Sequence, residues 1–127
     1  MSTFKVKVPD GALEHLLSRS ASWIPSKGRF LEFPDRDDLL EELLRRLLTK
    51  ATKLAGEPLI PLKCVLCRYD DNLASCALHS HPLQQLTLAL GAERPMLLGD
   101  TALILPEGRA VRIERGVPHG VPEQHSP

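Results

Sequence analysis

Apolar residues follow two different periods along the chain, and the change comes at Pro58. Leucine or alanine stands at positions 39, 40, 43, 44, 47, 48, 51 and 54, the spacing of one helical face. Asp37 and Asp38 favour the start of a helix, and Gly56 is placed to end it. The pattern therefore predicts one long amphipathic helix that covers one face of a sheet.

After Pro58 the apolar positions alternate with a period of two, which is typical of strands. We predict six short strands, over residues 61–69, 74–81, 84–90, 95–99, 101–105 and 109–114. Upstream, residues 3–8 suggest an edge strand, and residues 20–34 read as a loop anchored on the core by Trp23, Phe30 and Phe33. The expected fold class is α+β, mainly β, with the helix packed on a β-sandwich or jelly roll.

Composition limits the classes of protein to consider. A chain of 127 residues is expected to form a single domain, with a helical and loop part over about 1–57 and a β core over about 58–122. Sixteen acidic residues balance sixteen basic ones, so the basic excess of a dedicated nucleic-acid binder is missing from the total. No secretory leader or long apolar run stands out, and we expect an intracellular protein, cytoplasmic or nuclear, without a membrane segment.

Two histidines one residue apart are the first candidate for chemistry. In a strand, His79 and His81 leave the same face, so their imidazoles can take adjacent positions on one metal ion. His119, in "VPHGVP", is the candidate third ligand. Three such ligands with open positions suit non-haem iron or a catalytic zinc. The alternative is that each histidine makes an ordinary hydrogen bond at the end of a strand.

The cysteines offer a rival metal site. Cys64, Cys67 and Cys76, together with His79, have a spacing similar to that of a zinc finger. Two residues three apart in a strand point to opposite faces, however, and "CVLC" lies in an apolar strand pattern. We therefore expect buried, reduced cysteines that act as small hydrophobic residues. The sequence contains no GxGxxG or phosphate-binding loop motif and no nucleophile elbow.

Three segments resemble, in order, the core of the AlkB-type Fe(II)/2-oxoglutarate dioxygenases. They are "LIPLKCVLCRYDDNLASCALHSH", "LTLALGAER" and "LPEGRAVRIERGVPHGVP", and the match spans roughly residues 59–122. The resemblance implies a double-stranded β-helix, oxidation of an N-alkyl group such as one on a nucleobase, and a nucleic-acid or protein substrate. It implies Fe(II) on three ligands, with His79 and His119 at two matching positions and His81 at the third, and a 2-oxoglutarate site that includes Tyr69.

Departures from the family pattern lower the expected activity. His81 stands where the family has aspartate, Cys67 stands where it has asparagine, and no arginine follows His119. A dicarboxylate co-substrate needs a cationic partner, which Arg94 or Arg112 would have to supply. The alternatives are a cupin-like barrel, in which Gln85 replaces the usual glutamate, and a catalytically silent jelly roll that binds a metal or ligand.

Overall fold

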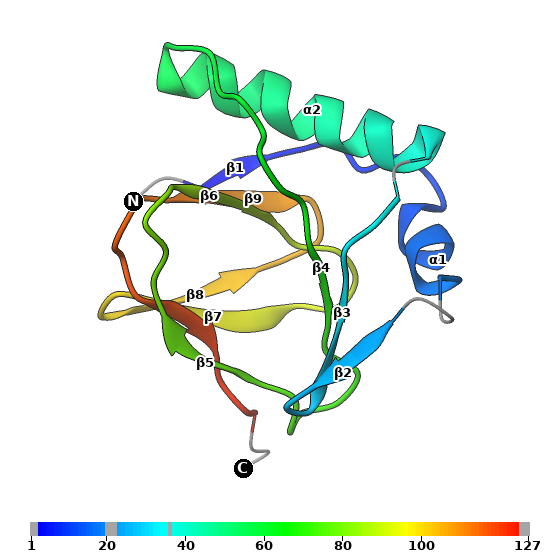
Figure 1. Ribbon diagram of the computed structural model, residues 1–127, viewed down its shortest axis with the longest axis vertical. Coiled ribbons are helices and arrows are strands. Elements are labelled where there is room, and N and C mark those ends of the chain that lie inside the picture. Colours follow the sequence, from blue (N-terminus) through cyan, green and yellow to red (C-terminus); the bar gives the residue numbers. More distant parts are fainter. Residues whose placement is uncertain (1–2, 20–22, 36, 125–127) are drawn as a thin grey trace.

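The computed structural model describes residues 3–19, 23–35 and 37–124 of the chain. Within these residues the fold is α+β and mainly β, as the sequence predicts (Figure 1). The helices are α1 (Ala12–Leu17) and α2 (Asp38–Ala55). The strands are β1 (Thr3–Lys5), β2 (Ile24–Ser26), β3 (Arg29–Glu32), β4 (Leu66–Arg68), β5 (Cys76–His79), β6 (Gln85–Leu88), β7 (Arg94–Leu98), β8 (Thr101–Leu105), β9 (Arg109–Ile113) and β10 (His119–Val121).

The long helix α2 lies where the leucine pattern places it. The Asp37 carboxylate accepts a hydrogen bond from the Leu40 amide, which satisfies one of the free N–H groups of the first turn. Gly56 ends the helix in the left-handed conformation, with φ of 74°. The residues that α2 buries are spaced by three or four positions and are Leu40, Leu43, Leu47 and Ala51. The predicted helix is confirmed.

Six strands in the second half of the chain pair as one long antiparallel ribbon. At its tip β7 pairs with β8, then β6 pairs with β9, and then β5 pairs with β10. The register is nearly continuous along this ribbon, since Leu98 lies opposite Thr101, Leu88 opposite Ala110 and His79 opposite His119. The ribbon folds over on itself, because β10 also pairs with β7. The pairs therefore divide between two sheets, ordered β1-β9-β6 and β5-β10-β7-β8.

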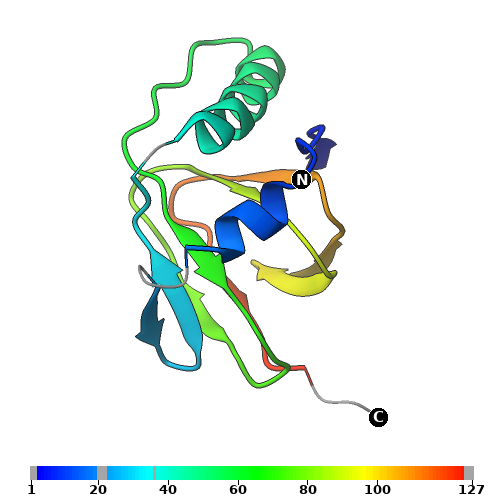
Figure 2. The same ribbon diagram turned by 90° about the vertical axis from the view of Figure 1, so that its right-hand side faces the viewer.

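The sheet β1-β9-β6 forms the middle layer of the molecule (Figures 1 and 2). One of its faces packs under α2, through a cluster that contains Phe4, Val6, Leu47, Ala51 and Ala110. Its other face packs on the sheet β5-β10-β7-β8, through a cluster that contains Met96, Leu98, Leu105, Val111 and Ile113. Alternation along β9 explains both contacts, because neighbouring residues of a strand point to opposite faces.

Two segments differ from the sequence prediction. The segment predicted as a loop contains a hairpin of β2 and β3, which β4 extends to a third sheet; residues 20–22 lie outside the described residues. Its turn, Lys27–Gly28, has two positive φ angles, the conformation that closes two-residue hairpins. Phe33, predicted to anchor the core, is 57% exposed.

The strand predicted over 61–69 is confined to Leu66–Arg68. The residues before β4 form an exposed connection in which Ile60 and Leu62 face solvent. Pro58 and Pro61 lack the amide hydrogen that a sheet ladder needs, so alternation alone does not make this part a strand.

The described strands form open sheets, and no closed barrel is found among them. Neither described helix has the length and apolar character needed to cross a membrane.

Candidate metal centre

The pairing of β5 with β10 brings two of the predicted ligands together. His79 ends β5 and His119 begins β10, and the two residues lie directly opposite each other in the antiparallel register. Directly opposed residues project from the same face of a sheet. His81 follows two residues after His79, and its carbonyl oxygen accepts a hydrogen bond of 2.8 Å from the Gly116 amide. The ribbon therefore holds all three histidines at one end of the sheet.

Gly120 allows β10 to approach β5 closely. A Cβ atom at this position would lie 2.6 Å from the Cys76 carbonyl oxygen and 3.1 Å from the Leu78 amide nitrogen. Both are backbone atoms of β5, which no side-chain rotation can move away. A residue with a side chain would therefore force the two strands apart beside His119.

The three imidazoles are close enough to share one ion. The ring centroids of His79 and His119 are 4.4 Å apart, those of His79 and His81 are 4.8 Å apart, and those of His81 and His119 are 5.2 Å apart. One candidate ligand atom from each ring lies within 4.8 Å of the other two. His119 is buried, whereas His79 and His81 are exposed, so the cluster opens to solvent on one side. The predicted convergence is confirmed.

Backbone carbonyls determine which ring nitrogens are available to a metal. Nδ1 of His79 lies 2.8 Å from the Ala77 carbonyl oxygen, and Nδ1 of His119 lies 3.0 Å from the Val117 carbonyl oxygen. A carbonyl only accepts hydrogen bonds, so each Nδ1 carries a proton, and in the neutral ring the lone pair that can bind a metal is on Nε2. This is the arrangement in which metal-binding histidines are usually held.

Nε2 of His119 is buried and has no hydrogen-bond partner among the described residues. Leaving a buried polar atom unpaired costs about 1–3 kcal/mol. A bound ion would supply the missing partner, so this atom is an observation in favour of a metal that does not depend on the sequence motif.

The surroundings of His81 favour its neutral form. Partial burial lowers the pKa of His81 below its ordinary value of 6.5, and the neighbouring rings of His79 and His119 act in the same direction. The Lys63 ammonium group also lowers this pKa. A neutral imidazole is the form that binds a metal. Lys63 is absent from the sequence prediction, because nothing in its local pattern relates it to a histidine eighteen residues later.

The donor set fits a divalent transition metal. Nitrogen atoms that share such an ion lie about 3.0–3.4 Å apart when each metal–nitrogen distance is near 2.1 Å. Small rotations of exposed His79 and His81 toward buried His119 would bring the three atoms to that spacing. Three imidazole ligands suit zinc or non-haem iron and leave further coordination positions open.

Two of the predicted co-substrate residues contact each other. The Arg94 guanidinium lies 5.0 Å from the centre of the Tyr69 ring, and burial raises the pKa of the Tyr69 hydroxyl. Arg94 also donates from Nη1 to the Asp71 carbonyl, at 2.8 Å, and from Nη2 to the Ala74 carbonyl. Both terminal nitrogens are therefore occupied in fastening the segment before β5, and in this arrangement they do not fit a clamp for a dicarboxylate.

Arg112 lies in a different part of the molecule. Its Nε contacts the Gln84 side chain at 2.5 Å and the Glu114 carboxylate at 3.4 Å. The side chain also lines a small cavity of about 60 Å³ under α2, together with Phe4, Ala51, Leu54 and Ala55. The structure thus places Arg112 on the face of β9 that packs under α2, and not on the face toward the histidine sheet.

The prediction that the cysteines are buried is wrong. Cys67 is exposed, on the edge strand β4 of its sheet, and Cys64 and Cys76 are half-buried. The cysteines also do not join a group with metal-binding geometry, since among the described residues that geometry is found for the three histidines. Cys76 does approach the histidine cluster, with Sγ 3.7 Å from Nδ1 of His79.

Comparison with known proteins adds no family assignment to this geometry: no protein family, no curated protein and no solved structure matches the chain.

Proposed function

We propose that this chain is a divergent, AlkB-like jelly-roll protein that holds one divalent metal ion on His79, His81 and His119. The observation that carries the proposal is the hydrogen bonding of the two opposed histidines, His79 and His119. Nδ1 of each is held by a backbone carbonyl, and Nε2 of His119 is buried and unpaired. Histidines that only end a strand do not need this arrangement.

The nested ribbon supports the jelly-roll part of the proposal. Successive pairs β7–β8, β6–β9 and β5–β10 alternate between two packed sheets, which is how a double-stranded β-helix is wound. The ribbon crosses from one sheet to the other between successive pairs. His81 and Gly116, joined by a backbone hydrogen bond, occupy such a crossing between the β5–β10 and β6–β9 pairs.

Fe(II), when bound, would supply the capacity to react with oxygen, and the protein would supply its positioning. His119 provides a fixed, buried ligand, and His79 and His81 provide ligands on the solvent side. The proposed reaction is oxidation of an N-alkyl group with 2-oxoglutarate as co-substrate. Because Arg94 is committed to backbone carbonyls and Arg112 lies under α2, the residues present do not fit the co-substrate well, and we propose weak turnover.

The same observation favours a second candidate, a catalytically silent module that binds a metal or a small ligand. Such a module needs the histidines but no cationic clamp. The two candidates differ in whether a cation near the histidines, such as the Lys63 ammonium group, holds an anionic co-substrate. An active enzyme would use this cation, or another, to hold an anionic co-substrate.

Metal content after purification without chelator or nickel resin tests the proposal. We expect about one equivalent of a divalent transition metal in the parent chain, loss of most of it in His79→Ala, and retention in His15→Ala. Succinate release from 2-oxoglutarate with Fe(II), with and without an alkylated oligonucleotide, then separates the two candidates. Robust succinate release that His79→Ala abolishes would favour the enzyme, whereas metal binding without succinate would favour the silent module. An absence of metal binding would reject both.

A further inference from the structure

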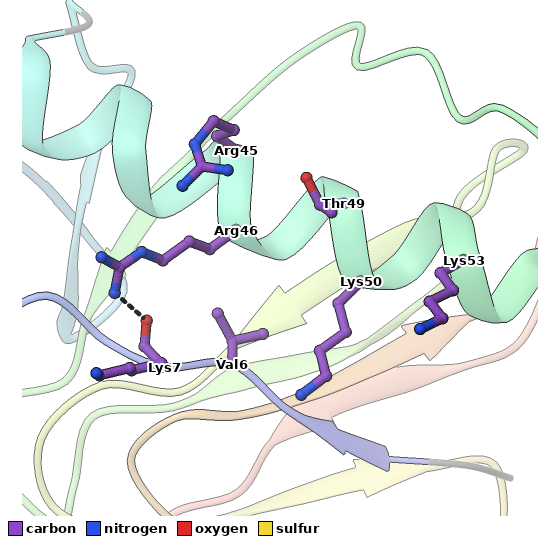
Figure 3. A pocket seen from close by; sticks show the side chains of 7 residues that line it. All are labelled: Val6, Lys7, Arg45, Arg46, Thr49, Lys50 and Lys53. Atoms are coloured by element: carbon purple, nitrogen blue, oxygen red, sulfur yellow. Dashed lines mark hydrogen bonds between the residues drawn. The ribbon is translucent and has the colours of Figure 1, made fainter.

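A basic groove runs along α2 on the side of the segment that follows β1. It has a volume of about 350 Å³, and Figure 3 shows the side chains that line it. These residues are Val6, Lys7, Arg45, Arg46, Thr49, Lys50 and Lys53. Five of the seven are cationic, in a chain whose acidic and basic residues are equal in number. The groove therefore carries a local excess of positive charge, although acidic and basic residues balance over the whole chain.

One carboxylate offsets part of this charge. Glu42 accepts hydrogen bonds from Arg45 at 2.6 Å and from Arg46 at 2.8 Å, and these two guanidinium groups lower its pKa to about 2. The lysines of the groove form no ion pair with the described residues; they are Lys7, Lys50 and Lys53. Five cationic side chains are thus offset by one carboxylate, which leaves a net charge of +4 on these six side chains.

The backbone arranges these cations along one line. Arg46, Lys50 and Lys53 follow each other at helical spacings of four and three residues, which correspond to rises of about 6 and 4.5 Å. Arg46 also donates from Nη1 to the Lys7 carbonyl at 2.9 Å, and this bond ties the opposite wall to the helix (Figure 3). Like charges at these helical spacings repel each other. Binding of an anion would relieve this repulsion.

We propose that this groove binds a multiply phosphorylated group, such as a free di- or triphosphate or the phosphorylated headgroup of a lipid. The volume is that of a small-ligand site, and clustered lysine and arginine groups suit phosphate oxygens. The aliphatic stems of these side chains and Val6 provide an apolar floor. No aromatic residue lines the groove, so it lacks the stacking platform of a single-stranded nucleic-acid site. The groove shares no residue with the histidine cluster and represents a second site.

Titration calorimetry with inorganic tripolyphosphate tests the proposal on the whole chain. We expect saturable binding and a higher midpoint of thermal unfolding when the probe is present. The double variant Lys50→Ala/Lys53→Ala should bind at least about tenfold more weakly, because each lost ammonium removes a charge-assisted hydrogen bond. Alanine favours helix, so α2 is expected to persist in this variant. Arg115→Ala removes an exposed charge outside the groove and is the matched control.

Vesicles of phosphatidylcholine, with and without phosphatidylinositol bisphosphate, distinguish the two sources of the phosphate group. Binding to the phosphorylated vesicles that is lost in the double variant would identify a headgroup, and binding of tripolyphosphate alone would identify a free ligand. Equal affinity in the double variant and in Arg115→Ala would overturn the proposal. Binding to duplex DNA without saturable tripolyphosphate binding would also overturn it, in favour of a nucleic-acid surface. His79→Ala should bind the probe like the parent chain.

Discussion

His119 lies directly opposite His79 across the β5–β10 pair, and both rings are held in the same way. Each donates its Nδ1 hydrogen to the carbonyl oxygen two residues before it, at 2.8 Å for His79 and 3.0 Å for His119. The register fixes the separation of the two side chains, and the carbonyls fix their tautomer. Two metal ligands are thereby prepared before any ion binds, at the cost of an unpaired Nε2 in His119.

Removal of His119 is expected to abolish most metal binding with little effect on the metal-free fold. The sheets are complete without the ion, so the chain should differ from a zinc finger, which unfolds when its metal is removed. At a metal concentration one hundred times the dissociation constant, binding stabilises the parent chain by about 2.7 kcal/mol. Thermal unfolding with and without metal should show this gain in the parent chain and not in His119→Ala. A gain of the same size in the parent chain and in His119→Ala would contradict the assignment of His119 as a metal ligand.

Gly120→Ala is expected to weaken metal binding by changing the backbone. The new Cβ would lie 2.6 Å from the Cys76 carbonyl oxygen, so β10 must move away from β5 and carry His119 with it. Such overpacking costs about 1–3 kcal/mol of folding free energy. Urea unfolding and a metal titration measure the two effects. Gly56→Ala, at the end of α2, should also destabilise the fold through its positive φ but leave metal affinity unchanged.

Arg94→Ala is expected to reduce stability and not metal content. The guanidinium supports the Asp71 and Ala74 carbonyls and stacks on Tyr69, so its loss leaves carbonyls unpaired. Hydrogen bonds to a charged group contribute about 1.5–3 kcal/mol, and urea unfolding should show a loss of this order. If Arg94→Ala instead left stability unchanged and eliminated succinate release, Arg94 would be the co-substrate clamp after all.

Asp37→Asn is expected to reduce the acid sensitivity of the fold. The Leu40 amide and the His15 side chain lower the pKa of Asp37 from 3.8 to about 2. Because the folded pKa is the lower one, the stabilisation from this carboxylate is complete above about pH 4 and disappears as the pH falls toward 2. Asparagine keeps the helix cap but does not titrate. Urea unfolding between pH 5 and 2 should show the parent chain more stable at pH 5 and the two proteins converging at pH 2. A constant difference across this range would contradict the role of Asp37.

Cys67 is expected to react with an uncharged alkylating reagent in the folded protein. The residue is exposed on β4, although local desolvation of its thiol raises the pKa of Cys67 above its ordinary value. The reaction requires the thiolate, so its rate should continue to rise as the pH passes the range of a free cysteine. Mass spectrometry of the Cys67→Ser variant after the same treatment measures how much Cys64 and Cys76 are alkylated. Protection of Cys67 until the protein unfolds would support the original expectation of a buried thiol.

Much of the secondary structure follows from local sequence. Helix α2 is predictable because each of its signals is local. The leucines repeat every three or four residues, Asp37 caps the first turn, and Gly56 ends the last turn. The β2–β3 hairpin also had a local signal, since Lys27–Gly28 supplies a turn with two positive φ angles, but the alternation around it is short. The exposed residues near Pro58 and Pro61 show that an alternation of apolar and polar residues does not by itself predict a strand. An extended connection can have the same alternation.

Strand alternation predicts that His79 and His81 share a face, but β5 ends at His79, so the position of His81 depends on the segment that follows the strand. The position of His119 beside these two histidines follows from the fold, since the register of the ribbon places residues forty positions apart opposite each other. Tertiary packing likewise decided that Arg94 supports a loop, that Arg112 lies under α2 and that Lys63 acts on His81. These relationships depend on which surfaces meet when the sheets pack, and no local period of the sequence encodes that information.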